Sequence, residues 1–186
     1  MNKKGKILNE KQAFNGHIFQ VVNRKIKTPD SLIVQRQIVL HSPSVALIAP
    51  IHINNELKFA IGTEYRAGFN SERTSFPAGL INSGEQPSQA ALRETREEIG
   101  LIYQKAEEIF QISSSEGFTN EVVHLMLLKK LTKKTKKNFD LGEFVKTNFL
   151  TFKELEKQVL LKKITAAPGI IGYMWLKLHP KVLKKL

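Results

Sequence analysis

Cysteine is absent from this sequence of 186 residues. Its absence excludes a disulfide framework, a thiolate-bound zinc site and catalysis by a cysteine nucleophile. Long apolar runs are absent too: none reaches the roughly 18 residues that a membrane-spanning helix needs, and the N-terminal residues lack the apolar stretch of a secretory signal. We therefore expect a cytoplasmic protein with no membrane partner.

Acidic residues are scarce, because 17 aspartates and glutamates stand against 29 lysines and arginines, and the formal net charge is +12. Such an excess could attract nucleic acid, phospholipid or small phosphorylated substrates. Residues 129–137, which we expect to form a loop, include six lysines but no aromatic side chain on which bases could stack. We interpret the excess as a solvated surface that mildly favours anionic substrates, and we expect no nucleic-acid partner.

Segments with strand-like patterns lie before and after one well-marked helix. The helix is expected over 87–99, because Pro87 suits a first helical position and Gly100 suits the position just past the end. A turn is expected at Asn54 and Asn55. This order of elements predicts an α+β fold with a mixed sheet flanked by helices. The expected strands are 14–22, 32–40, 45–53, 57–63, 109–113, 122–128 and 144–150, and further helices are expected over 152–159 and 168–178.

Three glutamates gather near the end of the first helix. Glu94 and Glu98 are four residues apart and share a helical face, and Glu97 lies close to them on the helical wheel. Like charges at this spacing repel each other, and the helix dipole disfavours negative charge at a C-terminus. A divalent cation would reverse both effects, because Mg²⁺ binds carboxylate oxygens and keeps water and substrate phosphates as its other ligands. The cluster therefore predicts a Mg²⁺ or Mn²⁺ site that binds phosphates.

The stretch 79–101 also resembles the Nudix box, a signature with fixed residues around such a helix. Its fixed positions are filled by Gly79, Glu85, Arg93, Glu94, Glu97, Glu98 and Gly100. Leu101 supplies the final aliphatic residue, and Thr95 stands where an aliphatic residue is usual, with a size that suits packing. The resemblance to Nudix hydrolases implies an α/β/α sandwich with a mixed sheet, in which the box forms a loop–helix–loop. It also implies hydrolysis of a nucleoside diphosphate linked to another group.

The same resemblance implies a role for each box residue. The metal ligands would be Glu94, Glu97, Glu98 and the backbone carbonyl of Ala78. Two of these, Glu97 and Glu98, would also be catalytic. Structural support would come from Gly79, Glu85, Arg93 and Gly100, with an ion pair between Glu85 and Arg93.

Outside the box, residues 15–155 resemble the ADP-ribose pyrophosphatase branch of the family. Glu64-Tyr65-Arg66 is similar to that branch's QYR, in which the arginine contacts substrate, and residues 76–79 are similar to its LPAG. Residues 36–46 are similar to the strand that leads into its HPGAV motif. Residues 113–121 are similar to its SPGFSDE loop. Residues 141–145 are similar to its DGEFVEV motif, which supplies a catalytic glutamate.

This second resemblance adds candidates to the site. Glu143 would be the general base, with Asp140 as the substitute candidate. Arg66 would bind phosphate or ribose, in competition with a role in a surface ion pair. Glu121 would help to hold substrate, or metal through water, unless it is a plain residue at a strand edge. Phe118 and Phe19 are the candidates for contact with the substrate base.

Two positions depart from the branch. Glu116 stands where the branch has its marker proline, and Ser75 stands where an acidic residue often precedes LPAG. The first departure leaves the substrate open between ADP-ribose and a related nucleotide sugar, such as another ADP-sugar or a GDP-sugar. The second could change the bracing of the loop or the occupancy of the metal site.

The predicted activity is Mg²⁺-dependent hydrolysis of the diphosphate of ADP-ribose or a related nucleotide sugar, which yields a nucleoside monophosphate and a sugar phosphate. The alternatives are an RNA 5′-end or nucleoside triphosphate pyrophosphohydrolase, and a non-catalytic nucleotide-sensing module, although the complete set of box carboxylates favours an enzyme. The resemblance further implies a homodimer with exchanged N-terminal strands. We expect residues 1–44 to form this strand region and 45–186 to form the Nudix domain with a C-terminal helix.

Overall fold

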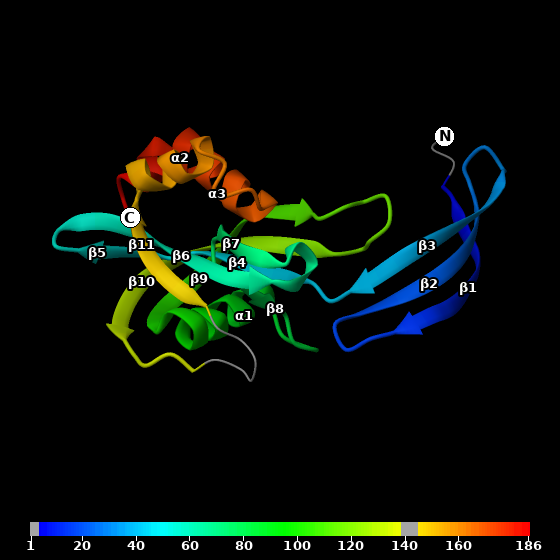
Figure 1. Cartoon of the computed structure of the whole chain (residues 1–186), viewed down its shortest axis with the longest axis horizontal. Helices are drawn as coiled ribbons and strands as arrows, with labels where there is room; N and C mark the ends of the chain where they lie inside the picture. The colour runs from blue at the N-terminus through cyan, green and yellow to red at the C-terminus, as the bar shows by residue number, and fades with distance from the viewer. Residues whose placement is uncertain (1–3, 139–144) are drawn as a thin grey trace. The chain divides into compact units, whose positions relative to one another are not determined.

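The computed structural model describes residues 4–138 and 145–186 (Figure 1). Across these ranges, no helix has the length and apolar character that a membrane crossing requires. The chain forms two compact units. The first comprises Met1–Pro43 and Ser113–Val122, and the second comprises Ser44–Ile112 and Val123–Leu186.

The first unit contains a three-stranded antiparallel sheet. Its strands follow one another along the chain as β1 (Lys6–Asn15), β2 (Phe19–Lys27) and β3 (Ile33–His41). Among the residues of this unit that the structure describes, Val22 alone is buried. A sheet that buries so little has no apolar face to impose an alternating pattern, so the sequence carries only a weak strand signal here.

The strand predicted over 14–22 is wrong, because the chain turns between β1 and β2. The backbone N–H of Gly16 donates to the carbonyl of Phe19 at 3.0 Å, which closes this turn. β1 begins at Lys6 and is largely polar, so its residue pattern does not indicate a strand. The strand predicted over 32–40 is confirmed as β3.

Residues 113–122 also belong to the first unit, because they bind the backbone of β3. The N–H of Val39 donates to the carbonyl of Phe118 at 2.7 Å, and the N–H of Asn120 donates to the carbonyl of Val39 at 3.3 Å. The side-chain oxygen of Asn120 accepts a further bond from the N–H of His41 at 2.9 Å. A segment distant in sequence thus adds to the edge of this unit.

The second unit is built on two sheets, of which the first is mixed. Its strand order is β8-β4-β10-β9. The central strands β4 (Ser44–Ile48) and β10 (Val122–Lys134) run parallel, and β8 (Ala78–Leu80) runs antiparallel to β4. The strand at the far edge is β9 (Leu101–Ser113). The mixed sheet that the order of elements predicts is therefore confirmed.

The second sheet has the order β11-β6-β5, with β7 paired to β6. The predicted turn between β5 and β6 is confirmed, because Asn54 and Asn55 have φ of 52° and 62°. Asparagine enters this left-handed region more readily than most residues, and the geometry suits a tight hairpin. The strand bounds are β5 (Pro50–Ile53), β6 (Glu56–Arg66), β7 (Ser71–Ser75) and β11 (Lys146–Thr151).

Helices lie on both sides of these sheets (Figure 1). α1 (Pro87–Glu94) lies on one side, and α2 (Phe152–Leu160) and α3 (Ala167–Leu178) lie on the other. A short helix, α4 (Pro180–Leu183), follows α3. The predicted α/β/α sandwich is confirmed by this arrangement.

The apolar run in β4 explains the layers. Successive strand residues point to opposite faces, so a strand that is buried on both sides is apolar throughout. Leu47 belongs to a buried cluster with Ala90 and Ala91 of α1, whereas Ile48 belongs to a second cluster with Leu155 of α2. The two clusters are the cores above and below the mixed sheet.

β9 and β10 are longer than the sequence indicates. The strands predicted over 109–113 and 122–128 cover only part of each, and the loop predicted over 129–137 is wrong as far as Lys134, where β10 ends. The ammonium group of Lys129 donates to the Glu107 carboxylate at 2.8 Å. Charged side chains can extend into solvent while the backbone continues its strand pairing. Such a strand lacks the apolar pattern on which strand prediction depends, so the sequence does not reveal it.

Candidate functional site

The candidate site begins with the helix that carries the glutamates. Pro87 occupies its first turn, and the side chains and backbones of Gln86 and Gln89 form a reciprocal capping box there. At the other end, Gly100 has a φ of 74°, the left-handed conformation that glycine adopts without strain. The helix predicted over 87–99 is confirmed in its extent.

The last turn of this helix is not α-helical, which corrects the predicted geometry. α1 ends at Glu94, and the π-helical turn η2 (Thr95–Ile99) follows it. Its wider ring is closed by the N–H of Gly100, which donates to the carbonyl of Thr95. Thr95 is fully buried, and its hydroxyl donates to the carbonyl of Ala91 at 2.5 Å. The wider turn changes the angle between Glu94 and the residues after it, so a shared α-helical face no longer describes them.

Glu94 packs directly against the backbone of β8. Its side chain is buried, and a methyl group placed on Gly79 would lie only 2.1 Å from the carboxyl carbon of Glu94 and 2.2 Å from one of its oxygens. Only glycine leaves room for the carboxylate at this point. Gly79 therefore sets the position of Glu94.

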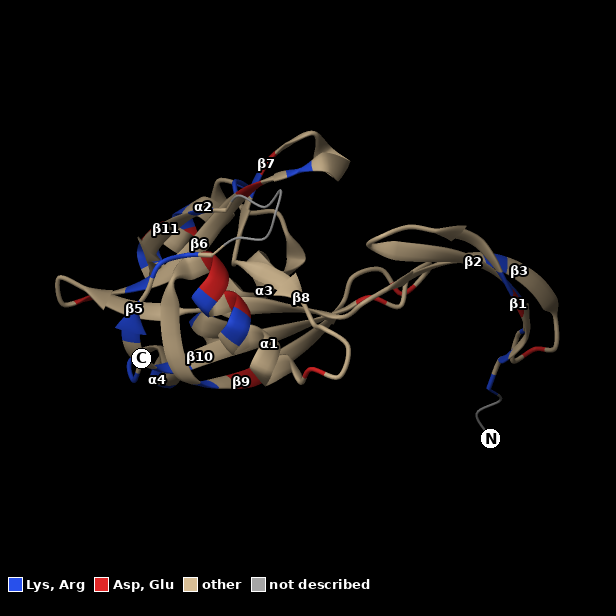
Figure 2. Ribbon diagram, turned by 90° about the horizontal axis from the view of Figure 1, so that it is seen from below, with Lys and Arg blue, Asp and Glu red and all other residues tan. Residues whose placement is uncertain are grey.

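Arg93 joins three carboxylates at the same helix end. Its guanidinium donates to both oxygens of Glu85, at 3.0 and 2.9 Å, and to the carbonyl of Leu80 at 2.9 Å. One of its terminal nitrogens also donates to Glu94 at 2.7 Å and to Glu97 at 3.2 Å. Figure 2 shows acidic and basic residues adjoining each other at the end of this helix. A single cation thus offsets the repulsion among these acids.

These contacts shift the pKa values of the groups involved. The hydrogen bond from Arg93 is the largest influence on Glu85 and lowers the pKa of that carboxyl. The hydrogen bond to Glu85, followed by that to Glu94, raises the pKa of Arg93 despite partial burial. Both groups are therefore held in their charged forms, as an ion pair between the loop and the helix requires.

Glu98 is the most deeply buried acid of the cluster, with 5% of its surface exposed. The segment after β10 passes close to it: the N–H of Thr135 donates to the carbonyl of Gly100 at 2.8 Å, and the N–H of Asn138 donates to the carbonyl of Glu97 at 2.9 Å. Burial lowers the pKa of Lys137 in this segment, while the negative charge of Glu98 acts in the opposite direction. A lysine thus lies within electrostatic reach of Glu98.

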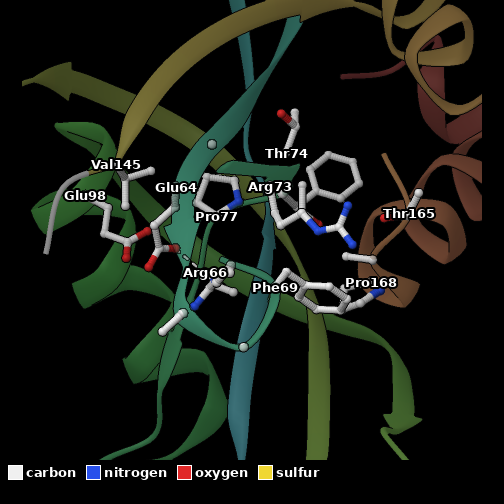
Figure 3. Close-up of a pocket in the computed structure, with 17 residues that line it drawn as sticks. Glu64, Arg66, Phe69, Arg73, Thr74, Pro77, Glu98, Val145, Thr165 and Pro168 are labelled. Atoms are coloured by element: carbon white, nitrogen blue, oxygen red, sulfur yellow. Dashed lines mark ion pairs between the residues drawn. The ribbon is translucent and has the colours of Figure 1, made fainter. Parts of the chain in front are cut away.

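Glu98 also lines a cavity of about 390 Å³ (Figure 3). This volume lies within the usual range for pockets that bind small molecules. Arg66 lines the same cavity and forms an ion pair with Glu64, with 2.9 Å between nitrogen and oxygen. The remaining charged side chain in the lining is Arg73. The other lining residues that bear on its chemistry are Phe69, Thr74, Ser75, Pro77, Ala78, Val145, Thr165 and Pro168.

Metal ligation is supported by the kind of donor rather than by a formed cluster. Across the two described ranges, no three histidine, aspartate or glutamate side chains lie close enough together to hold a metal ion. Glu94 and Glu97 instead share one nitrogen of Arg93. Three carboxylates on one helix end are nevertheless the oxygen donors that a hard divalent cation requires. The residues present therefore fit Mg²⁺ or Mn²⁺ by their chemistry.

The other predicted site residues fall in different places. Arg66 and Ala78 line the cavity together with Glu98. Phe118 and Glu121 belong to the first unit, where the Phe118 side chain is exposed and a Glu121 oxygen lies 3.6 Å from the ring of His41. Their predicted contact with substrate stays a prediction. The proposed base and its substitute, Glu143 and Asp140, lie outside the described residues.

Sequence reasoning missed three residues around the site. Arg73 and Phe69 line the cavity, and Lys137 approaches Glu98. The first two lie between the motifs at residues 64–66 and 76–79, where the residues match no pattern that we used. Lys137 was counted only as part of a basic stretch, and its place follows from the pairing of distant strands.

Comparison with known proteins agrees with this geometry. A family model described as NUDIX domain matches residues 53–169. The chain is 32% identical over 187 residues to the methanol dehydrogenase activator of Bacillus methanolicus, covering 97% of this chain and 100% of that protein. It is 28% identical over 174 residues to the ADP-ribose pyrophosphatase of Bacillus subtilis (strain 168), covering 93% and 92% respectively.

A solved structure has the same fold. It is described as an ADP compounds hydrolase and superposes with a TM-score of 0.79 over 95% of this chain and 96% of that one, at 17% identity. The chain therefore belongs to the Nudix domain family. Within that family it is a Nudix hydrolase of the ADP-ribose pyrophosphatase-like kind.

Proposed function

We propose that this hydrolase cleaves the diphosphate of ADP-ribose or a related nucleotide sugar in a reaction that depends on Mg²⁺ or Mn²⁺. The observation that carries the proposal is that Glu98 and Arg66 line one cavity, next to Glu94 and Glu97 on the same helix end. Carboxylates and an arginine fork are the groups that a metal-bound diphosphate needs. The relatives described as ADP-ribose pyrophosphatases support the choice of substrate.

The metal would be held by Glu94, Glu97, Glu98 and the carbonyl of Ala78. When bound, such an ion neutralises diphosphate charge and lowers the pKa of a water molecule. Arg66 would bind a phosphate oxygen through its planar donors. Glu143 stays our proposed general base, on the strength of its sequence motif.

The proposed activity is tested with ADP-ribose and a panel of nucleotide sugars, in the presence of Mg²⁺, Mn²⁺ or EDTA, with detection of the nucleoside monophosphate. We expect Glu98→Gln to lower kcat/KM at least 100-fold, because it removes a proposed ligand and its charge. Glu56→Gln is the matched control, since this glutamate is exposed on β6 and, within the described residues, forms its ion pair with Lys58.

Undetectable hydrolysis of every compound with either metal would contradict the substrate assignment. Nucleoside triphosphates and an RNA with a 5′-triphosphate belong in the same panel, because they represent the alternative pyrophosphohydrolase activities. Full activity in EDTA would contradict the proposed metal dependence.

A second candidate is activation of a methanol dehydrogenase. It is favoured by the relative described as a methanol dehydrogenase activator, which matches 97% of this chain over its own full length. The test compares the rate of a purified methanol dehydrogenase with and without this protein. An increase that disappears with Glu98→Gln would link activation to the same site, and an unchanged rate would contradict this candidate.

We also propose a cytoplasmic homodimer formed by the first unit. Among residues 4–43 of this unit, seven large apolar side chains are at least 40% exposed, which is unusual for a sheet that ends at solvent. A second copy of the same sheet would cover them. These side chains are Ile7, Leu8, Phe14, Ile18, Phe19, Leu32 and Ile33.

A further inference from the structure

Among the described residues, the second arginine of the cavity, Arg73, has no acidic partner. Glu64 is its cross-strand neighbour between β6 and β7, but the Glu64 carboxylate lies 2.9 Å from Arg66. Among residues 4–138 and 145–186, the Arg73 side chain forms no ion pair and donates no hydrogen bond. Its side chain is nevertheless partly buried. A partly buried guanidinium carries five N–H donors in a fixed plane, which suit an anionic ligand.

The ring of Phe69 holds this guanidinium in place. The central carbon of Arg73 lies 4.0 Å from the centroid of the Phe69 ring, which is a cation–π contact. Such stacking occupies one face of the guanidinium and leaves the N–H groups at its edge available. This contact orients the guanidinium before any ligand arrives, which lowers the entropic cost of binding an anion.

Arg73 and Glu98 lie on different sides of the cavity. Figure 3 shows Glu98, Glu64 and Arg66 on one side, and the Arg73 guanidinium directed toward the side where Thr165 and Pro168 lie. The proposed metal and diphosphate belong to the Glu98 side. Arg73 is thus placed to meet a different part of the same substrate.

We propose that Arg73, supported by Phe69, forms a subsite for a second anionic group of the substrate. The ligand class is a nucleoside diphosphate compound that carries, on either of its two substituents, a phosphate monoester or a carboxylate in addition to the diphosphate. This inference rests on the proposed diphosphatase activity and deepens it. An arginine fork binds both phosphate and carboxylate through paired hydrogen bonds, so it suits either group.

Two matched pairs of substrates test this subsite. ADP-ribose and 2′-phospho-ADP-ribose differ by a phosphate on the nucleoside side, and UDP-glucose and UDP-glucuronate differ by a carboxylate on the sugar side. We expect the wild-type protein to show at least a 10-fold higher kcat/KM for the more anionic member of one pair. Equal or lower kcat/KM for the more anionic member of both pairs would overturn the subsite.

Variants of Arg73 then assign the preference to this residue. Arg73→Ala should lower kcat/KM for the preferred anionic substrate about 10- to 100-fold, the range of a charged hydrogen bond, and change its less anionic partner less than 3-fold. Arg73→Lys should lie in between, because it keeps the charge but loses the fork. Phe69→Leu should also lie in between, because it removes the support of the guanidinium while leaving its charge. Lys105→Ala is the control, since it removes one exposed positive charge on β9.

The outcomes separate this inference from the proposed function. No hydrolysis of any of the four compounds would contradict the diphosphatase itself. Hydrolysis of both members of a pair with an equal loss in Arg73→Ala would place Arg73 on the shared diphosphate and overturn the subsite. Thermal melting of each variant identifies any that fail to fold, and the wild-type preference decides the question independently of them.

Discussion

At the scale of single residues, the site depends on Gly79, because glycine has no side chain. Gly79 leaves the space that the Glu94 carboxylate fills, and a methyl group there would come within 2.1 to 2.6 Å of three carboxyl atoms. Contacts this short force the carboxylate to move. Gly79→Ala should therefore lower the catalytic activity more than it lowers the free energy of unfolding.

We expect Gly79→Ala to lower kcat/KM about 100-fold, a loss typical of small misplacement in a catalytic site. The far-UV circular dichroism spectrum should stay that of the wild type. Gly117→Ala is the control, because no atom lies within 4 Å of a methyl group at that position. Activity within 3-fold of the wild type in Gly79→Ala would show that the position of Glu94 is unimportant.

At the scale of elements, the end of the π-helical turn is fixed by Gly100. Its φ of 74° disfavours other residues, and a methyl group would lie 2.6 Å from the carbonyl oxygen of Thr135. Gly84 has a similar φ of 78° with no atom within 4 Å of a methyl group there. The two glycines separate the cost of backbone conformation from the cost of the contact.

We expect Gly84→Ala to lower the free energy of unfolding by about 1 kcal/mol, and Gly100→Ala by about 3 kcal/mol, because only the second adds a steric clash to the strained φ. Chemical denaturation of both variants measures this. Equal losses would mean that the segment at Thr135 moves aside without cost.

Local signals in the sequence predicted the elements that hold the site. Pro87 and Gly100 marked the ends of the helix, and the spacing of its glutamates marked the acidic cluster. The resemblance to the Nudix box implied the ion pair between Arg93 and Glu85. The apolar run 45–53 predicted one buried strand. It did not show that the run is divided into β4 and β5.

Features that depend on tertiary contacts escaped prediction. The π-helical turn gave no signal in the pattern of apolar residues. Arg73 meets Phe69 through the fold of the segment between β6 and β7, and Lys137 meets Glu98 through the long strand before it. β1 was missed because it packs on no core that would pattern its residues.

At the scale of the whole molecule, the first unit is too thin to be a complete structure. Its described residues bury one side chain, while Phe14 and Ile33 are 53% and 60% exposed. Exposed apolar strands of this kind associate with another chain unless something covers them. The proposed homodimer would remove this liability.

Light scattering coupled to size-exclusion chromatography should therefore give twice the mass of one chain. We expect Phe14→Lys combined with Ile33→Lys to produce a monomer, because buried charge opposes association. Leu160→Lys is the control, since this leucine is 71% exposed on α2 in the second unit. A monomeric wild-type protein would contradict the proposed dimer.

Arg93 donates hydrogen bonds to Glu85, Glu94 and Glu97. This arrangement bears on whether the chain must bind a metal before it can fold. Many metal sites assemble only with their ion, so that folding waits for it. Here a positive charge carried by the chain itself already holds these acids at the helix end. The protein can therefore complete its folding where divalent ions are scarce, and the proposed metal would bind afterwards.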